Sequence, residues 1–101
     1  MWTEQMVKEC IDRNDEDVCK AVVTIYRRQT RDERNSYSTH ETNGVGFNKF
    51  DAEILTSFAK QIIFNKDVGR RYLLSRKQIE IARKRIRKYA KQLAKIANGE
   101  I

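Results

Sequence analysis

The stretch SRKQIEIARKRIRKYAKQLAKIANG (residues 75–99) decides the fold expected for this chain. Apolar side chains recur in it at alternating spacings of three and four residues, which places them on one stripe of a helix. The members of this stripe are Ile79, Ala82, Ile86, Tyr89, Leu93 and Ile96. The stretch opens with a capping box formed by Ser75 and Gln78, and it closes on Asn98 before a glycine. A long amphipathic helix is therefore expected from Arg76 to about Asn98.

Three further helices are expected before this one, because the chain has no proline and few glycines to interrupt them. The first runs from about Thr3, its predicted N-cap, to Arg13. Asp15 is the predicted N-cap of the second, which continues through a polar, solvated extension over residues 27–34. The third follows a loop over residues 35–47. These patterns predict an all-α fold: a single domain over residues 1–101, folded as a compact bundle of about four helices with a long basic C-terminal helix.

The third helix is predicted to lie at the centre of the bundle. Its start has the form of a capping box, Asn48 with Asp51, and a broad apolar face follows. We expect this face to pair antiparallel with the apolar stripe of the last helix, with the first helix covering one side. The alternative is that the stripe joins two copies of the chain. Phe47 is predicted to pack on the third helix as a hydrophobic staple, and the aromatic side chains Phe50, Phe58 and Tyr89 are assigned to the core.

The positive charge is concentrated in the last third of the chain. The net charge is +7, yet residues 70–101 alone hold eleven basic and two acidic residues. Helical geometry sorts the cations of the last helix to both sides of the apolar stripe: lysines at 77, 84, 88, 91 and 95 lie on one side, and arginines at 76, 83 and 87 on the other. A helix face that is only solubilising interleaves Glu with Lys, and here Glu80 alone does so. A polyanion-binding surface is therefore favoured over a merely solvated face.

The predicted contacts are to the phosphates of DNA or RNA rather than to bases in a chosen sequence. They comprise Arg70, Arg71, Lys77, Arg83, Lys84, Arg87, Lys88, Lys91 and Lys95, with Gln29, Thr30, Tyr37, Asn43 and Phe47 as further contacts around the loop. Exposed aromatic residues in connecting segments, Tyr37, Phe47 and Tyr72, are candidates for stacking on bases. The function predicted from these residues is that of a non-catalytic nucleic-acid-binding accessory protein.

Three segments resemble small bacteriophage-type proteins of poorly defined role and accessory segments of phage DNA-processing proteins. They are Tyr26-Arg27-Arg28-Gln29-Thr30, then Asn43-Gly44-Val45-Gly46-Phe47, then Leu74-Ser75-Arg76-Lys77-Gln78. The resemblance implies a phage or prophage origin and work beside nucleic acid or against a host enzyme. The alternative function is thus inhibition of a host defence nuclease complex, in the manner of an anti-CRISPR protein, by docking on a host protein or ribonucleoprotein. A homodimeric structural adaptor is the third.

Catalytic and cofactor chemistry find little support in the sequence. His40 is the single histidine and lies in a polar loop, and no spacing assembles a nucleophile with a base, so we expect a non-enzyme without cofactors. Cys10 and Cys19 fall on apolar helical faces and share no metal-ligand spacing with His40, so neither a metal site nor a disulfide is expected.

There is no membrane-spanning run and no secretion signal near Met1. The expected location is the cytoplasm, that of the host cell if a phage encodes the chain, and the expected state is a monomer or homodimer.

Overall fold

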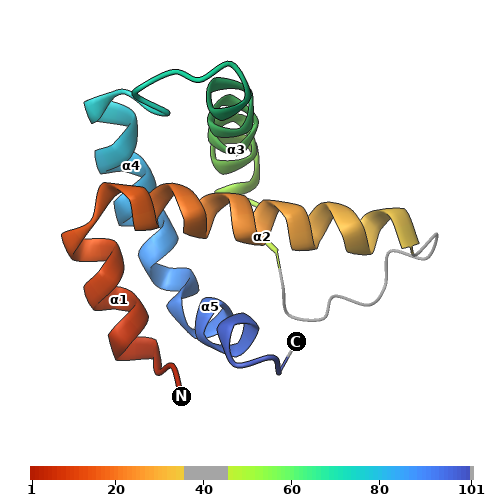
Figure 1. The fold of residues 1–101 in the computed structure, drawn as a ribbon. Helices are drawn as coiled ribbons and strands as arrows, with labels where there is room; N and C mark the ends of the chain where they lie inside the picture. The colour runs from red at the N-terminus through yellow and green to blue at the C-terminus, as the bar shows by residue number, and fades with distance from the viewer. Residues whose placement is uncertain (36–45, 101) are drawn as a thin grey trace.

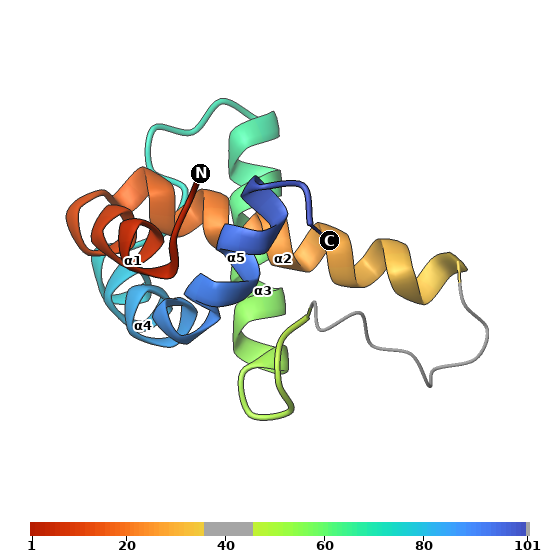
Figure 2. The same cartoon turned by 90° about the horizontal axis from the view of Figure 1, so that it is seen from below.

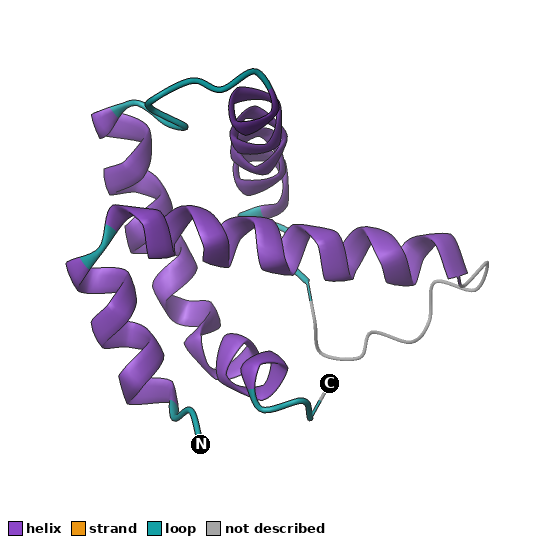
Figure 3. Cartoon of the chain, in the orientation of Figure 1, coloured by secondary structure: helices purple, strands orange, loops and turns teal. Residues whose placement is uncertain are grey.

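The computed structural model describes residues 1–35 and 46–100, and among these it omits the side chains of residues 30–35. It confirms an all-α fold in which no strand occurs among the described residues (Figure 3). The elements are α1 (Glu4–Arg13), α2 (Asp15–Asn35), α3 (Ala52–Asp67), α4 (Arg76–Ile86), the 3-10 turn η1 (Arg87–Tyr89) and α5 (Ala90–Ala97). The predicted long C-terminal helix is thus α4, η1 and α5 in succession, and the predicted extension of the second helix is helical as far as Asn35.

Two of the four predicted signals for helix starts are confirmed. The Thr3 hydroxyl accepts a hydrogen bond from the Met6 amide, and the capping box of Ser75 and Gln78 is formed in both directions. At α2 the prediction was wrong by one residue. Asn14, not Asp15, accepts a hydrogen bond from the Glu16 amide at 2.9 Å. Asparagine is a strong N-cap in its own right, and the extended backbone of Asn14 lets it end α1 as well.

The centre of the bundle is α2, which corrects the prediction that the third helix lies there. Val18, Val22 and Ile25 are completely buried, and the helix packs on α3 along one side and on α4 along another. In Figure 1, α2 runs across the other helices and its C-terminal half extends beyond them. The predicted antiparallel pair is also wrong, because α4 makes its main contacts with α2 and few with α3. A broad apolar face did not require a central position, since Phe64 of α3 and its C-cap Val68 remain exposed.

The C-terminal helix changes direction at η1, so its two halves meet different partners. α4 packs on α2, and α5 packs on α1 (Figures 1 and 2). The backbone N–H of Trp2 donates to the side chain of Asn98 at 2.8 Å, and that side chain donates back to the Trp2 carbonyl at 2.8 Å. The helix end predicted at Asn98 therefore also fixes the segment that leads into α1.

The aromatic assignments are confirmed in part. Phe58 and Tyr89 belong to the core, whereas Phe50 is 86% exposed, so its assignment was wrong. Phe47 packs against the core and lies edge-on to Tyr89 of η1, with ring centroids 5.7 Å apart, and the staple on the third helix stays a prediction. No helix in the described ranges is long and apolar enough to cross a bilayer.

Candidate nucleic-acid interface

A buried carboxylate holds the start of α3 to the C-terminal helix. Asp51 is fully buried and accepts from Arg85 Nη1 at 2.8 Å, from Lys88 Nζ at 2.7 Å and from the Tyr89 hydroxyl at 2.7 Å. The Tyr89 oxygen in turn accepts from the Asn48 amide at 2.8 Å. The Asn48 side chain accepts from the amides of Phe50 and Asp51, as in an Asx turn. Only one half of the predicted capping box therefore forms: the Asn48 side chain accepts from the Asp51 amide, but the Asp51 carboxylate binds side chains more than thirty residues away instead of the Asn48 amide.

The protonation of this cluster follows from its partners. Burial alone would raise the pKa of Asp51, but hydrogen bonds from Lys88, Tyr89 and Arg85 outweigh it and hold that pKa below its ordinary value of 3.8. Burial, aided by the hydrogen bond to the Asp51 carboxylate, raises the pKa of Tyr89 to about 12, although the Asn48 amide opposes the shift. A charged carboxylate and a neutral phenol are thus the forms that the fold stabilises at neutral pH.

A second set of ion pairs joins the C-terminal helix to the N-terminal third of the chain. Arg83 Nε donates to the Ile11 carbonyl at 2.8 Å, and its Nη2 forms an ion pair with Asp15. Arg87 Nε lies 3.2 Å from Asp12 Oδ1. Arg83 and Arg87 therefore bind acidic residues at the ends of α1 and α2, which offset part of their charge within the fold. Arginine suits such sites because its planar guanidinium donates in several directions at once.

The cations left outside these pairs are mostly lysines. Lys77, Lys84, Lys91 and Lys95 are exposed, and the salt bridges found in the described part of the chain involve none of them. At about 100° per residue they point away from the buried stripe of Ile79, Ala82, Ile86, Leu93 and Ala94. We call these four residues the lysine face. Of the predicted contacts, Arg83, Arg87 and Lys88 therefore serve the fold, and the lysine face remains available to a partner.

Arg70 and Arg71 lie in the connector between α3 and α4, which presents them to solvent. The Arg71 guanidinium carbon is 5.5 Å from the centroid of the Tyr72 ring, a cation–π contact, and Tyr72 is 73% exposed. The connector leads directly into α4, whose first turn holds no acidic residue but carries Arg76 and Lys77. Positive charge therefore continues from the connector onto the lysine face.

The predicted loop contacts are only partly described. Gln29 accepts from the Phe47 amide at 2.8 Å, and Gln92 accepts from the Gly46 amide at 3.1 Å, so both glutamines position the segment that enters α3. Phe47 is half-buried through its contact with Tyr89 and is not free to stack on a base. Thr30 lies in α2, but its side chain is not described, and Tyr37 and Asn43, like His40, lie outside the residues that the structure describes.

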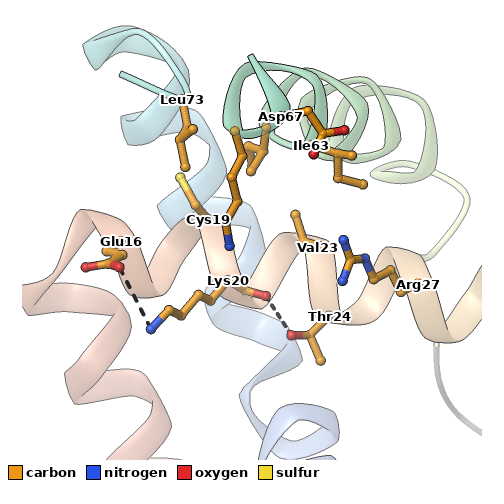
Figure 4. A pocket seen from close by; sticks show the side chains of 11 residues that line it. Glu16, Cys19, Lys20, Val23, Thr24, Arg27, Ile63, Asp67 and Leu73 are labelled. Carbon is orange, nitrogen blue, oxygen red and sulfur yellow. Dashed lines mark hydrogen bonds and ion pairs between the residues drawn. The ribbon is translucent and has the colours of Figure 1, made fainter. Parts of the chain in front are cut away.

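Two clefts flank α2, and neither gathers catalytic groups. The cleft in Figure 4, of about 340 Å³, lies between α2 and α3 and has aliphatic walls with a rim of mixed charge. The cleft between α1, α2 and α5, of about 370 Å³, is lined mainly by apolar side chains.

Both cysteines are free thiols, and burial, with the nearby charges of Asp15 and Glu16, raises the pKa of Cys19 to about 11. Such a thiol is inert at neutral pH. The described residues contain no cluster of metal-ligating side chains.

The sequence analysis missed the role of Asp51. It also missed that the arginines of this segment form ion pairs within the fold while most of its lysines do not. One signal could have revealed the second: the residues flanking the apolar stripe are mainly Arg, whereas those opposite it are Lys. Arginine at the edge of a packed face indicates ion pairs within a fold or interface.

Comparison with known protein families, with curated proteins and with solved structures finds no match for this chain.

Proposed function

We propose that this chain is a non-catalytic protein that binds the phosphate backbone of nucleic acid through the lysine face. The observation that carries the proposal is that the cations of the C-terminal segment fall into two sets, those that form ion pairs within the fold and those that do not. Arg83, Arg85 and Arg87 form ion pairs with acidic residues of the fold, while four lysines on the outer side of α4 and α5 have no such partner among the described residues. Like charges left together on one helix face destabilise it, and an external polyanion would relieve that repulsion.

The dimensions of the lysine face suit a nucleic-acid backbone. Lys77 and Lys84 lie on α4, about 10 Å apart along its axis, and Lys91 and Lys95 lie on α5, about 6 Å apart, so the lysine face spans the change of direction at η1. Duplex DNA carries a phosphate charge about every 1.7 Å of axis, so its phosphates are dense enough for lysines on both segments to meet them. Lysine suits this role because its flexible stem follows an irregular backbone without the fixed geometry of a guanidinium. Arg70, Arg71 and Arg76 extend the same positive surface toward the start of α4.

The decisive experiment compares two variants of equal charge. In the first, Lys77, Lys84, Lys91 and Lys95 are replaced by Gln. In the second, four other exposed lysines of α2, α3 and the segment before α3 are replaced: Lys20, Lys49, Lys60 and Lys66. Each variant lowers the net charge from +7 to +3. Lys88 is left intact in both because it binds the buried Asp51.

Binding to fluorescent single- and double-stranded DNA and RNA is measured by anisotropy over a series of salt concentrations. The first variant should lose affinity, and the slope of log K against log salt should fall by about 0.9 for each duplex phosphate contact removed. The second should bind nearly as the unmodified protein does. Equal effects of the two variants would mean that net charge alone drives association, and the proposed surface would be wrong.

A second candidate, docking on a host protein as an inhibitor of a nuclease complex, is favoured by a different observation. Phe64, in the last turn of α3, and Val68, the residue that caps its C-terminus, are four positions apart and are 59% and 54% exposed. Exposed apolar groups of this kind are typical of protein contacts. This function predicts a stoichiometric complex that Phe64→Ser with Val68→Ser abolishes and that the four-lysine variant does not. Size-exclusion chromatography with a purified nuclease complex distinguishes the two functions.

A further inference from the structure

The connector between α3 and α4 is exposed at its tip yet firmly held at its base. Asn65, which is only 7% exposed, donates through Nδ2 to the Leu73 carbonyl at 2.8 Å. Its own backbone carbonyl accepts from the Arg70 amide at 2.8 Å. One residue thus fixes both sides of the segment that contains Arg71 and Tyr72.

An amide pair reinforces this base from the side of α4. The side chains of Gln61 and Gln78 exchange two hydrogen bonds, at 2.9 and 3.0 Å, and Gln78 also completes the capping box with Ser75. Leu74 is buried in the core. Because each neighbouring position is tied to α3 or α4, the exposed tip is presented in a fixed arrangement.

The tip combines an aromatic ring with cations. Tyr72 keeps 73% of its surface exposed although Arg71 lies over its ring. Arg70 and Arg71 are exposed on the same connector, and Arg76 and Lys77 follow in the first turn of α4. A large exposed ring is costly to leave in water, whereas stacking on a base removes it from water and places the attached phosphates beside the neighbouring cations.

From this arrangement we infer that Tyr72 stacks on an unpaired base, so that the preferred ligand of the protein is single-stranded nucleic acid. The inference rests on the proposed function, because the lysine face supplies the backbone contacts, and it adds the class of nucleic acid. In a duplex the bases are stacked on one another and offer no face to Tyr72. A single strand engages both the ring and the lysine face, and a duplex engages the lysine face alone.

The test removes the aromatic ring from the protein and the bases from the ligand. Tyr72→Leu keeps an apolar side chain of similar size, and Tyr72→Trp keeps an aromatic surface. Each variant and the unmodified protein are titrated against an oligothymidine strand, an abasic strand of equal length and a duplex. Because Tyr72 lies on the surface, circular-dichroism melting curves of the variants should match that of the unmodified protein.

The expected result is that Tyr72→Leu weakens binding to oligothymidine by about fivefold or more, as loss of one stacked base predicts. Binding to the abasic strand and to the duplex should be unchanged, and Tyr72→Trp should retain full affinity for oligothymidine. Equal affinity of Tyr72→Leu and the unmodified protein for oligothymidine would overturn the stacking inference, and so would an equal loss on the abasic strand. Absence of binding to all three ligands by the unmodified protein would overturn the proposed function as well.

Discussion

Replacing Asp51 by Asn should destabilise the fold more than any other change of a single charge among the described ion pairs. Asp51 is the one fully buried partner in those pairs, and two cations and a phenol converge on it. Asparagine has nearly the same shape, so the substitution removes the charge without opening a cavity. What remains is a neutral amide facing Arg85 and Lys88, with one oxygen still able to accept from Tyr89.

The magnitude follows from the contacts that are lost. A hydrogen bond to a charged group contributes about 1.5–3 kcal/mol, and Asp51 accepts three. The simple sum is too large, because the side chains of Arg85 and Lys88 are 40% and 51% exposed and can recover water. We therefore expect the free energy of unfolding to fall by about 2–4 kcal/mol. A domain of this size has about 5–15 kcal/mol in total.

Urea denaturation followed by circular dichroism measures this change. The midpoint should fall by roughly 1–3 M. Asp12→Asn is the matched control, because Asp12 pairs with Arg87 but is 46% exposed, and a surface pair contributes only about 0.2–1 kcal/mol. The reasoning is refuted if the two variants lose equal stability, since burial would then not govern the strength of the pairs.

The same variant has a defined pH dependence. The pKa of Asp51 is lowered in the folded protein, so its contribution to stability is fully present above the unfolded value, about 4. As the pH falls below that value and through the folded pKa, the carboxylate takes up a proton and the contribution is lost. The difference in unfolding free energy between the unmodified protein and Asp51→Asn should therefore shrink in acid.

Three further predictions concern the remaining contacts of the core. The pKa of Cys19 is raised to about 11 in the folded protein, so the stability that this thiol contributes is fully present below pH 9 and is lost as the pH rises toward 11. The free energy of unfolding in alkaline melts should fall by about 2–3 kcal/mol over this range. Cys19→Ala should remove this loss, and Cys10→Ala should keep it. Tyr89→Phe removes a donor to Asp51 and should cost about 1–2 kcal/mol in urea denaturation, and a neutral effect would contradict the geometry. Arg83→Lys keeps the charge but cannot reproduce both of the contacts that Arg83 makes, so its melting temperature should fall by about 4–8 °C; no fall would mean that charge alone suffices.

Features encoded by neighbouring residues could be predicted from the sequence. The capping box at Ser75, the N-cap at Thr3 and the apolar stripe beginning at Ile79 each depend on residues only three or four positions apart, where helical geometry is known in advance. The structure confirms all three. The same local rules misassigned Asp51, because a carboxylate three residues after Asn48 has the form of a capping box whatever it contacts in the folded chain.

Features that join distant residues could not be predicted in this way. Asp51 meets Arg85 across a separation of 34 residues, and Arg83 meets Asp15 across 68. No periodicity within one helix indicates which cations will find such partners. The central position of α2 could not be predicted for the same reason. An apolar face shows that a helix is buried, but it does not show which other helices pack against it. The basic surface was therefore predicted as one set, and the structure divides it into a paired and an unpaired half.

The packing of α1 on α5 has a consequence for the order in which the chain folds. Val7 and Ile11 of α1 are buried in a bundle that α5 helps to close, and Asn98 holds the backbone of Trp2 from 96 residues away. During synthesis α1 leaves the ribosome long before α5 does, so the part of its apolar face that α5 covers stays open until α5 emerges. The central helix α2 can already pair with α1 and α3 at that stage, but α1 gains its final partner only when α5 emerges. The complete docking of α1 is thus expected as a late step of folding.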